Sequence, residues 1–165
     1  MKPRSSIVLV VLMLVLAGCS GYRPLYGTGP EGTSVVAALS SVTVPEQRTR
    51  IGQLLRNELL SGLNSDGSNK FELRLVITEN TSAVSSLTST TVNRKRYNLS
   101  VKYELVALTS GDRITSGNSF ANVAYDTVRE PVADLQAANN ARGRATTEVG
   151  QDIRQRLAAF AATHK

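Results

Sequence analysis

The side chain with the most distinctive chemistry in this 165-residue chain is the thiol of Cys19, its only cysteine. It directly follows Leu16-Ala17-Gly18, at the end of an apolar run that begins at Ile7 and carries no charge. A thiolate is a strong nucleophile, so a cysteine can take up a lipid through a thioether bond. Since the sequence has no second thiol for a disulfide, this residue is a candidate for covalent lipid attachment.

The segment before Cys19 resembles a bacterial lipoprotein signal peptide. A short basic region, residues 1–6, precedes eleven apolar residues, and Leu-Ala-Gly-Cys stands where a lipobox would. Eleven residues are too few for a membrane-spanning helix of about 20. We therefore expect a signal peptide over residues 1–18, cleavage before Cys19, a diacylglycerol on its sulfur and an acylated amine. The alternatives are a signal anchor with an incidental cysteine and a buried structural cysteine.

A second group of candidate residues is basic and lies in the middle of the chain. Arg94, Lys95 and Arg96 open a segment of alternating apolar and polar residues, and Lys102 follows within it. In a strand, Arg94, Arg96 and Lys102 would project from one face and Lys95 from the other. Guanidinium groups match phosphate oxygens, so the four are candidate contacts for phosphorylated lipid headgroups. The alternative is a solvated strand whose charges protect a sheet edge.

Four arginines near the C-terminus are interpreted as part of an exposed helix surface rather than as a binding site. They are interspersed with Glu148 and Asp152, a pattern typical of a helix surface with ion pairs. The four are Arg142, Arg144, Arg154 and Arg156. We expect them to form an ordinary salt-bridged surface.

The sequence offers little for catalysis. Its single histidine, His164, is the penultimate residue, where chain ends fray, so a serine or threonine nucleophile would lack a histidine base. The sequence has no phosphate-binding glycine loop and no His, Cys, Asp and Glu set with metal-ligand spacing. We expect a protein that is not an enzyme, with no cofactor beyond the covalent lipid on Cys19. Aromatic residues make up only 5% and tryptophan is absent, which argues against a nucleic-acid partner.

Composition divides the chain into three parts. Cleavage of residues 1–18 removes Lys2 and Arg4 and lowers the net charge from +6 to +4. Residues 19–34 are rich in Gly, Pro, Ser and Thr and predict a lipid-anchored tether. Its Tyr22–Tyr26 stretch holds two aromatics and a leucine, which could pin the tether to the domain or to a partner. Residues 35–165 are enough for a single domain with its own core.

Hydrophobic periodicity predicts the first half of this domain. Val35–Val44 is rich in β-branched residues and predicts a strand that Pro45 ends. From Glu46 the spacing becomes helical, and a polar turn follows at residues 64–68. One apolar helix face is assigned to Ile51, Leu54, Leu55, Leu59 and Leu63. Alternation over residues 71–78 predicts a strand with one buried face, and residues 80–91 predict a loop or ragged edge.

The second half predicts two more strands and a long helix. Residues 97–105 alternate clearly, residues 109–112 form a hairpin turn, and a weaker strand over 113–125 indicates a sheet edge or exposure on both faces. After Pro131 small and apolar residues follow helical spacing, with close packing or a bend expected at Gly143 and Gly150. The order β-α-β-β-β-α predicts an α+β two-layer sandwich, with two helices packed on one face of a four-stranded, mostly antiparallel sheet.

Several segments of the chain, in this order, resemble the alphaproteobacterial form of LptE, the lipopolysaccharide-assembly lipoprotein family. Leu16–Gly27, with the sequence LAGCSGYRPLYG, looks like the start of that family. Arg96–Leu99, Ala124–Asp126 and Ile153–Ala158 agree with its later segments. Each motif is short, and their joint order and spacing carry the resemblance, which covers most of the chain after Cys19.

The resemblance implies a lipid-anchored protein at the periplasmic face of the outer membrane. Ser20, in place of an aspartate after the cysteine, fits that sorting. The protein would plug the β-barrel LptD, help the barrel to assemble, and take part in passing lipopolysaccharide to the outer leaflet. Its partners would be an LptD-type barrel and lipopolysaccharide. The phosphates of lipid A make Arg94, Lys95, Arg96 and Lys102 candidate lipopolysaccharide-binding residues.

Two other functions remain as alternatives. A structural or assembly lipoprotein of another envelope machine, such as a secretin pilot or a barrel-assembly accessory, would share the anchor and the small α+β body. It would have no affinity for lipopolysaccharide. An envelope hydrolase fits least, because the sequence has no internal histidine and no metal-ligand cluster.

Overall fold

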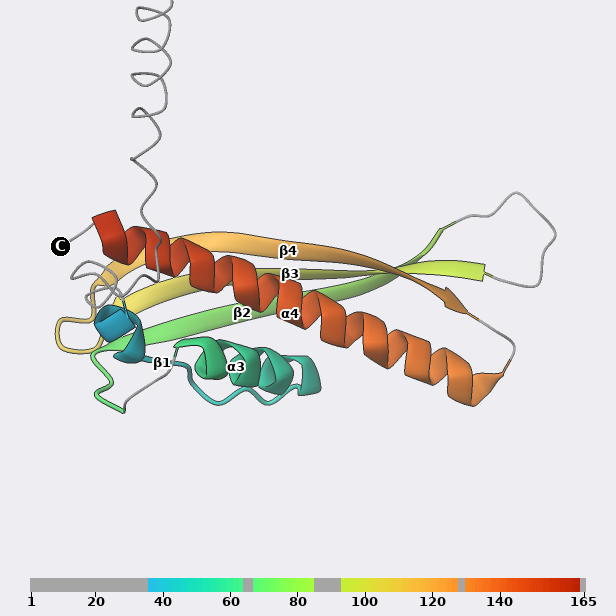
Figure 1. Cartoon of the computed structure of the whole chain (residues 1–165), viewed down its shortest axis with the longest axis horizontal. Helices are drawn as coiled ribbons and strands as arrows, with labels where there is room; N and C mark the ends of the chain where they lie inside the picture. Colours follow the sequence, from blue (N-terminus) through green and yellow to red (C-terminus); the bar gives the residue numbers. More distant parts are fainter. Residues whose placement is uncertain (1–35, 64–66, 85–92, 128–129, 164–165) are drawn as a thin grey trace, which may run out of the picture.

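The computed structural model describes residues 36–63, 67–84, 93–127 and 130–163. Their elements follow the predicted order β-α-β-β-β-α (Figure 1). In chain order they are β1 (Val42–Thr43), α3 (Arg50–Leu63), β2 (Phe71–Val84), β3 (Asn93–Ala107), β4 (Arg113–Thr127) and α4 (Pro131–Thr163). Thr49 caps α3, because its side-chain Oγ1 accepts a hydrogen bond from the Gly52 amide at 3.1 Å.

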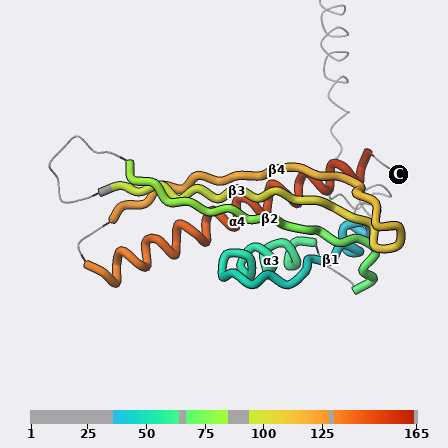
Figure 2. The backbone as a smooth tube through the Cα atoms, turned by 180° about the vertical axis from the view of Figure 1, so that it is seen from behind, coloured from blue at the N-terminus to red at the C-terminus, as the bar shows by residue number. Residues whose placement is uncertain are grey.

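The four strands form one sheet in the order β1-β2-β3-β4. The strands β2, β3 and β4 pair antiparallel along nearly their whole length, whereas β1 pairs parallel with β2 only at Phe71 and Glu72. Both helices lie on one face of this sheet, with α4 crossing the long strands diagonally and α3 beside the half nearer β1 (Figures 1 and 2). The predicted α+β two-layer sandwich is confirmed.

The hydrophobic core fills the space between the sheet and the helices. The odd-numbered residues of β3 from Tyr97 to Leu105 point into it, as strand alternation requires. On α3 the buried side chains recur every four residues, and on α4 they begin with alanines and continue with larger aliphatics. The largest fully buried side chains include Leu55, Leu59, Leu73, Tyr97, Leu99, Val149, Ile153 and Leu157.

The small residues of α4 let this helix approach its neighbours closely. Ala141 and Ala145 are fully buried. A Cβ atom on Gly150 would lie only 2.6 Å from Cγ of Glu58, so the expected close packing is confirmed there. At Gly143 a Cβ atom would meet nothing within 4 Å, and close packing was the wrong expectation at that position.

Two predicted elements differ from the structure, and a third settles between its two predicted alternatives. In the segment predicted as a first strand, residues 36–40 are helical and only Val42–Thr43 is a strand, because Ala37, Ala38 and Leu39 favour a helical turn over a strand. The predicted loop at residues 80–91 begins later, since β2 continues to Val84 by pairing with β3. Of the two alternatives for residues 113–125, the sheet edge is confirmed, because β4 is the last strand of the sheet. Exposure on both faces is not observed, because α4 covers one face of β4.

Candidate functional site

Basic residues gather where β3 begins, at the end of the molecule farthest from the β3–β4 hairpin. We call this set the basic end: Arg94, Lys95 and Arg96 of β3, together with Arg142 and Arg144 of α4. The antiparallel register sets the end of β4 beside the start of β3, with Arg94 opposite Asp126 and Arg96 opposite Ala124. The strand and the helix together therefore place five cations in one region.

The alternation predicted for the β3 cations is confirmed. Arg94, Arg96 and Lys102 are exposed on the outer face, which we define as the face of the sheet away from the helices. Lys95 points to the helix side, where its Nζ lies 3.9 Å from Oδ2 of Asp134 on α4. Lys102 follows Arg96 by six residues, or about 20 Å along a strand. The four candidates thus do not form one compact site.

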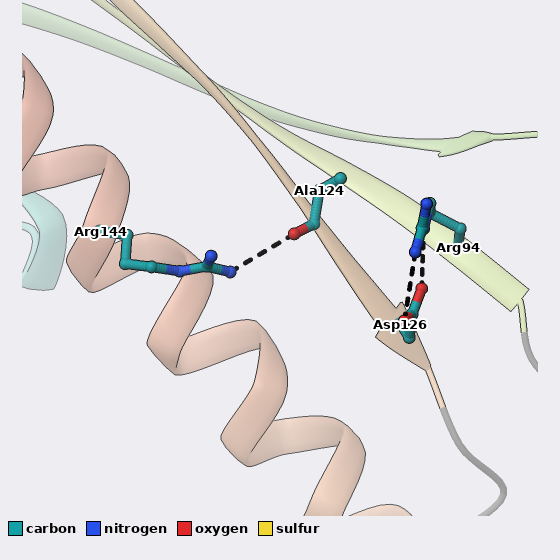
Figure 3. Close-up of polar contacts among 4 residues, drawn as sticks. All are labelled: Arg94, Ala124, Asp126 and Arg144. Atoms are coloured by element: carbon teal, nitrogen blue, oxygen red, sulfur yellow. Dashed lines mark hydrogen bonds and ion pairs between the residues drawn. The ribbon is translucent and has the colours of Figure 1, made fainter.

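Arg94 has a carboxylate partner across the strand pair. Its Nε lies 2.8 Å from Oδ1 of Asp126, and its Nη2 lies 3.4 Å from Oδ2 (Figure 3). The hydrogen bond from Arg94 and its charge hold the pKa of Asp126 below its usual range, and the same contact raises the pKa of Arg94. Both side chains are exposed, so the pair contributes little to stability. Its main effect is to neutralise the charge of Arg94 locally.

Two arginines of α4 adjoin this strand end without an ion pair among the described residues. Arg144 donates through Nη2 to the carbonyl oxygen of Ala124 at 3.4 Å (Figure 3). The Arg142 guanidinium lies 5.8 Å from the centroid of the Tyr97 ring, within range of a cation–π contact. The Tyr97 hydroxyl donates to Oε2 of Glu79 at 2.8 Å. Burial, with this bond to Glu79, raises the pKa of Tyr97 above its usual range, so the hydroxyl keeps its proton.

The expectation of an ordinary salt-bridged surface on the last helix is confirmed for one half of it. Arg154 pairs with Glu58 of α3 at 3.3 Å, and Arg156 pairs with Asp152 one turn earlier at 2.9 Å. Arg142 and Arg144 instead belong to the basic end, which that interpretation missed. Their distance in sequence from β3 hid this, and only the crossing of α4 over the sheet brings them together.

The outer face carries no helix in the described part of the chain (Figure 2). Its side chains are mostly hydroxyls, amides and charges. Two large apolar side chains stand among them, Val76 at 64% exposure and Phe120 at 65%. The polar members on the three long strands include Thr78, Asn80, Asn98, Ser100, Asn118 and Asn122. Such a face suits water or a polar surface better than it suits lipid chains.

The lipidation candidate, Cys19, and the single histidine of the chain, His164, are not among the residues that the structure describes. Within the ranges that are described, no three His, Cys, Asp or Glu side chains gather closely enough to hold a metal ion. The same ranges contain no helix that is both long and apolar enough to cross a membrane.

Because Asp126 neutralises Arg94, removing the carboxylate of Asp126 should strengthen binding to anionic lipid. We expect Asp126→Asn, in the chain carrying Cys19→Ser, to bind vesicles with anionic lipid about fivefold more tightly at low salt, because one freed cation near such a surface contributes about 1 kcal/mol. Co-sedimentation with the vesicles measures this. Asp112→Asn in the hairpin makes the same change in net charge. Equal gains in the two variants would show that net charge, not the basic end, controls binding.

Comparison with known proteins finds no matching protein-family profile and no matching curated protein. Solved structures do match. A protein from Caulobacter crescentus, described as a putative lipoprotein, has a TM-score of 0.69 and 26% identity, covering 81% of this chain and 98% of its own. The rare lipoprotein B of Shewanella oneidensis has a TM-score of 0.56 and 16% identity, and the match covers 74% of this chain and 95% of that protein. A minor lipoprotein of Acinetobacter baumannii has a TM-score of 0.55 and 14% identity, and the match covers 72% of this chain and 88% of that protein.

The fold is that of small bacterial lipoproteins. The two structures with lower identity establish the fold alone, and the Caulobacter protein adds sequence likeness over nearly its whole length. These likenesses support the lipoprotein prediction that was based on the segment before Cys19. The structural likeness and the signal-like segment are independent observations, because the likeness concerns the folded domain and the segment precedes it in the sequence.

Proposed function

We propose that the protein is an outer-membrane lipoprotein of the LptE type, anchored through Cys19 on the periplasmic face. It plugs the LptD β-barrel, helps that barrel to assemble, and takes part in lipopolysaccharide transport to the outer leaflet. The observation that carries the proposal is the likeness to the Caulobacter lipoprotein over 81% of this chain. The sequence resemblance to LptE, from Leu16 to the last helix, supplies the specific function.

The outer face supports a position inside a barrel. The lumen of an outer-membrane barrel is lined by polar side chains, because the lipid-facing residues lie on its outside. The hydroxyl and amide side chains of β2, β3 and β4 would form hydrogen bonds with such a wall. The exposed side chain of Phe120, also on this face, would add a hydrophobic contact.

The basic end supports a contact with phosphorylated lipid. Asp126 partly neutralises Arg94, and Asp134 lies near Lys95. Arg96 and Lys102 project from the outer face and form no ion pair with the described residues. Of the four candidates, these two would contribute most to lipopolysaccharide binding, because Arg94 and Lys95 each already have a carboxylate partner.

We expect Arg96→Ser with Lys102→Ser to weaken lipopolysaccharide binding roughly 5- to 30-fold, at about 1 kcal/mol for each cation near an anionic lipid surface. Titration of lipopolysaccharide micelles at physiological salt measures the loss. The matched control is Arg74→Ser with Arg113→Ser, which removes the same charge from residues already paired with Glu72 and Glu104. Equal losses of lipopolysaccharide affinity in both double variants would contradict a specific role of Arg96 and Lys102 in binding.

The proposal as a whole is tested by purifying the mature, lipidated protein from its native outer membrane in mild detergent. Mass spectrometry then identifies the chains that co-purify. A large barrel of the LptD type in near-stoichiometric amount is the expected result. A secretin or a barrel-assembly complex in its place would favour the alternative, an assembly lipoprotein of another envelope machine, and would overturn the role in lipopolysaccharide transport.

A further inference from the structure

An apolar cavity opens at the end of the sandwich opposite the basic end. Its volume is about 370 Å³, near the lower limit for cavities that hold a ligand. Every described residue that lines it is apolar, and all four strands and α4 contribute to the wall. The lining includes Leu39, Phe71, Leu105, Ile114, Leu157 and Phe160.

The cavity is a continuation of the core that the described residues leave open. Leu39, Leu105 and Leu157 belong to the buried core, whereas Ile114 at its rim is 38% exposed. Water in such a cavity finds no hydrogen-bond partners on the walls, and a volume of this size corresponds to roughly a dozen molecules of liquid water. An apolar group that displaces this water is therefore favoured.

The chain itself supplies such a group close by. The described residues begin at Val36, and Ala38, two residues later, already lines the cavity. The tether before it, residues 19–34, contains three large apolar or aromatic side chains, all between Tyr22 and Tyr26. Ala38 lies thirteen positions after Leu25, and a Gly- and Ser-rich linker of that length spans about 20 Å on average. Leu25 can therefore return to the mouth of the cavity without strain.

We propose that the Tyr22–Tyr26 segment of the tether docks into this cavity through Leu25 and Tyr26. The attachment is within one chain, so even a weak contact is populated, because a short flexible linker gives an effective concentration on the order of millimolar. The inference does not depend on the partner of the protein. It would hold for any lipoprotein with this tether and this cavity.

Docking would set how far the domain can move from the membrane. Seventeen residues link Cys19 to Val36 and reach at most about 60 Å when extended. With Tyr26 held by the domain, only seven residues remain between the lipid and the domain, which limits the reach to about 25 Å. The tether would then present the domain in a restricted position beside the bilayer, with the cavity end toward the membrane.

Disulfide formation in the full lipidated chain tests the contact. Leu25→Cys is combined either with Ile114→Cys at the rim or with Asn118→Cys, which lies four residues further along β4 on the outer face. The acylated Cys19 has no thiol to interfere. We expect the first pair to cross-link within the chain at least fivefold more than the second under mild oxidation. Equal yields, or disulfides between two copies, would overturn the proposal.

Hydrogen exchange in the chain without added cysteines gives a second readout. Leu25→Ser with Tyr26→Ser should speed exchange of the amides at residues 157–161 roughly threefold or more, because the end of α4 loses its cover. Thr28→Ser serves as the control in the same tether. Unchanged exchange at Leu59 and Val101, deep in the core, shows that the fold is intact. If Cys19→Ser alone deprotects the helix end and the tether variant does not, an acyl chain fills the cavity and the proposal fails.

Discussion

Cys19→Ala should leave the protein as an uncleaved precursor without lipid, absent from the outer membrane. In the proposed lipidation the thiol accepts the diacylglycerol, and alanine offers no nucleophile in its place. A single acyl chain binds a membrane only marginally, with an association constant of about 10⁴ M⁻¹, whereas several chains on one residue anchor nearly permanently. Intact-mass measurement should find residues 1–18 still present in the variant and replaced by lipid in the wild type.

A second variant separates the anchor from export. Cys19→Ala is placed behind the signal peptide of an ordinary secreted protein, cleaved just before position 19. This chain should reach the periplasm with the same fold and remain in the soluble fraction. Its partition into membranes should fall by at least about a hundredfold relative to the lipidated protein, since no acyl chain contributes. Lipid on either variant, or continued outer-membrane fractionation, would refute the lipoprotein assignment.

The fold could be predicted from the sequence wherever one face of an element is buried. The strand β3 alternates without a break from Tyr97 to Leu105, and the structure buries those odd-numbered residues. The small and apolar stripe of α4 likewise gave a helix within a few residues of its observed bounds. Periodicity succeeds in these cases because the core imposes the same period on the side chains.

Prediction from the local sequence pattern fails where pairing with a distant segment of the chain determines the structure. Residues 80–84 are mostly polar and typical of a loop, yet β2 extends through them because Ser82 and Val84 lie opposite Arg96 and Arg94 in the register. The reverse occurs at residues 36–40, where a segment predicted as a strand is a helical turn. Tertiary pairing outweighs the intrinsic preference of a few residues in the first case, and the alanines outweigh the valines in the second.

The candidate site could be predicted only in part for the same reason. The sequence is sufficient to divide the β3 cations between two faces, since alternation is local. It cannot show that Asp126, thirty-two positions from Arg94, is the partner of that arginine. Nor can it show that Arg142 and Arg144 stand beside the strand, because the crossing of α4 over the sheet depends on the packing of the whole core.

The helix α3 offers the sharpest test of the packing, because two adjacent leucines differ completely in burial. Leu55 is 0% exposed and Leu54 is 39% exposed, although helical spacing in the sequence assigned both to one apolar face. At 3.6 residues per turn, Leu54 lies about 120° from the centre of the stripe formed by Ile51, Leu55, Leu59 and Leu63. The structure therefore corrects the assignment of Leu54.

Leu55→Ala should lower the free energy of unfolding by about 2–5 kcal/mol, since it removes buried methyl groups and leaves a cavity between α3 and the sheet. That is a large share of the roughly 5–15 kcal/mol that stabilises a typical domain. Leu54→Ala, the matched control, should cost less than about 1 kcal/mol, because a surface substitution seldom does more. Urea unfolding of the chain carrying Cys19→Ser measures both as shifts in midpoint at constant slope. Equal losses would mean that α3 is rotated about its axis, which would move Glu58 away from Arg154 and contradict the ion pair between the two helices.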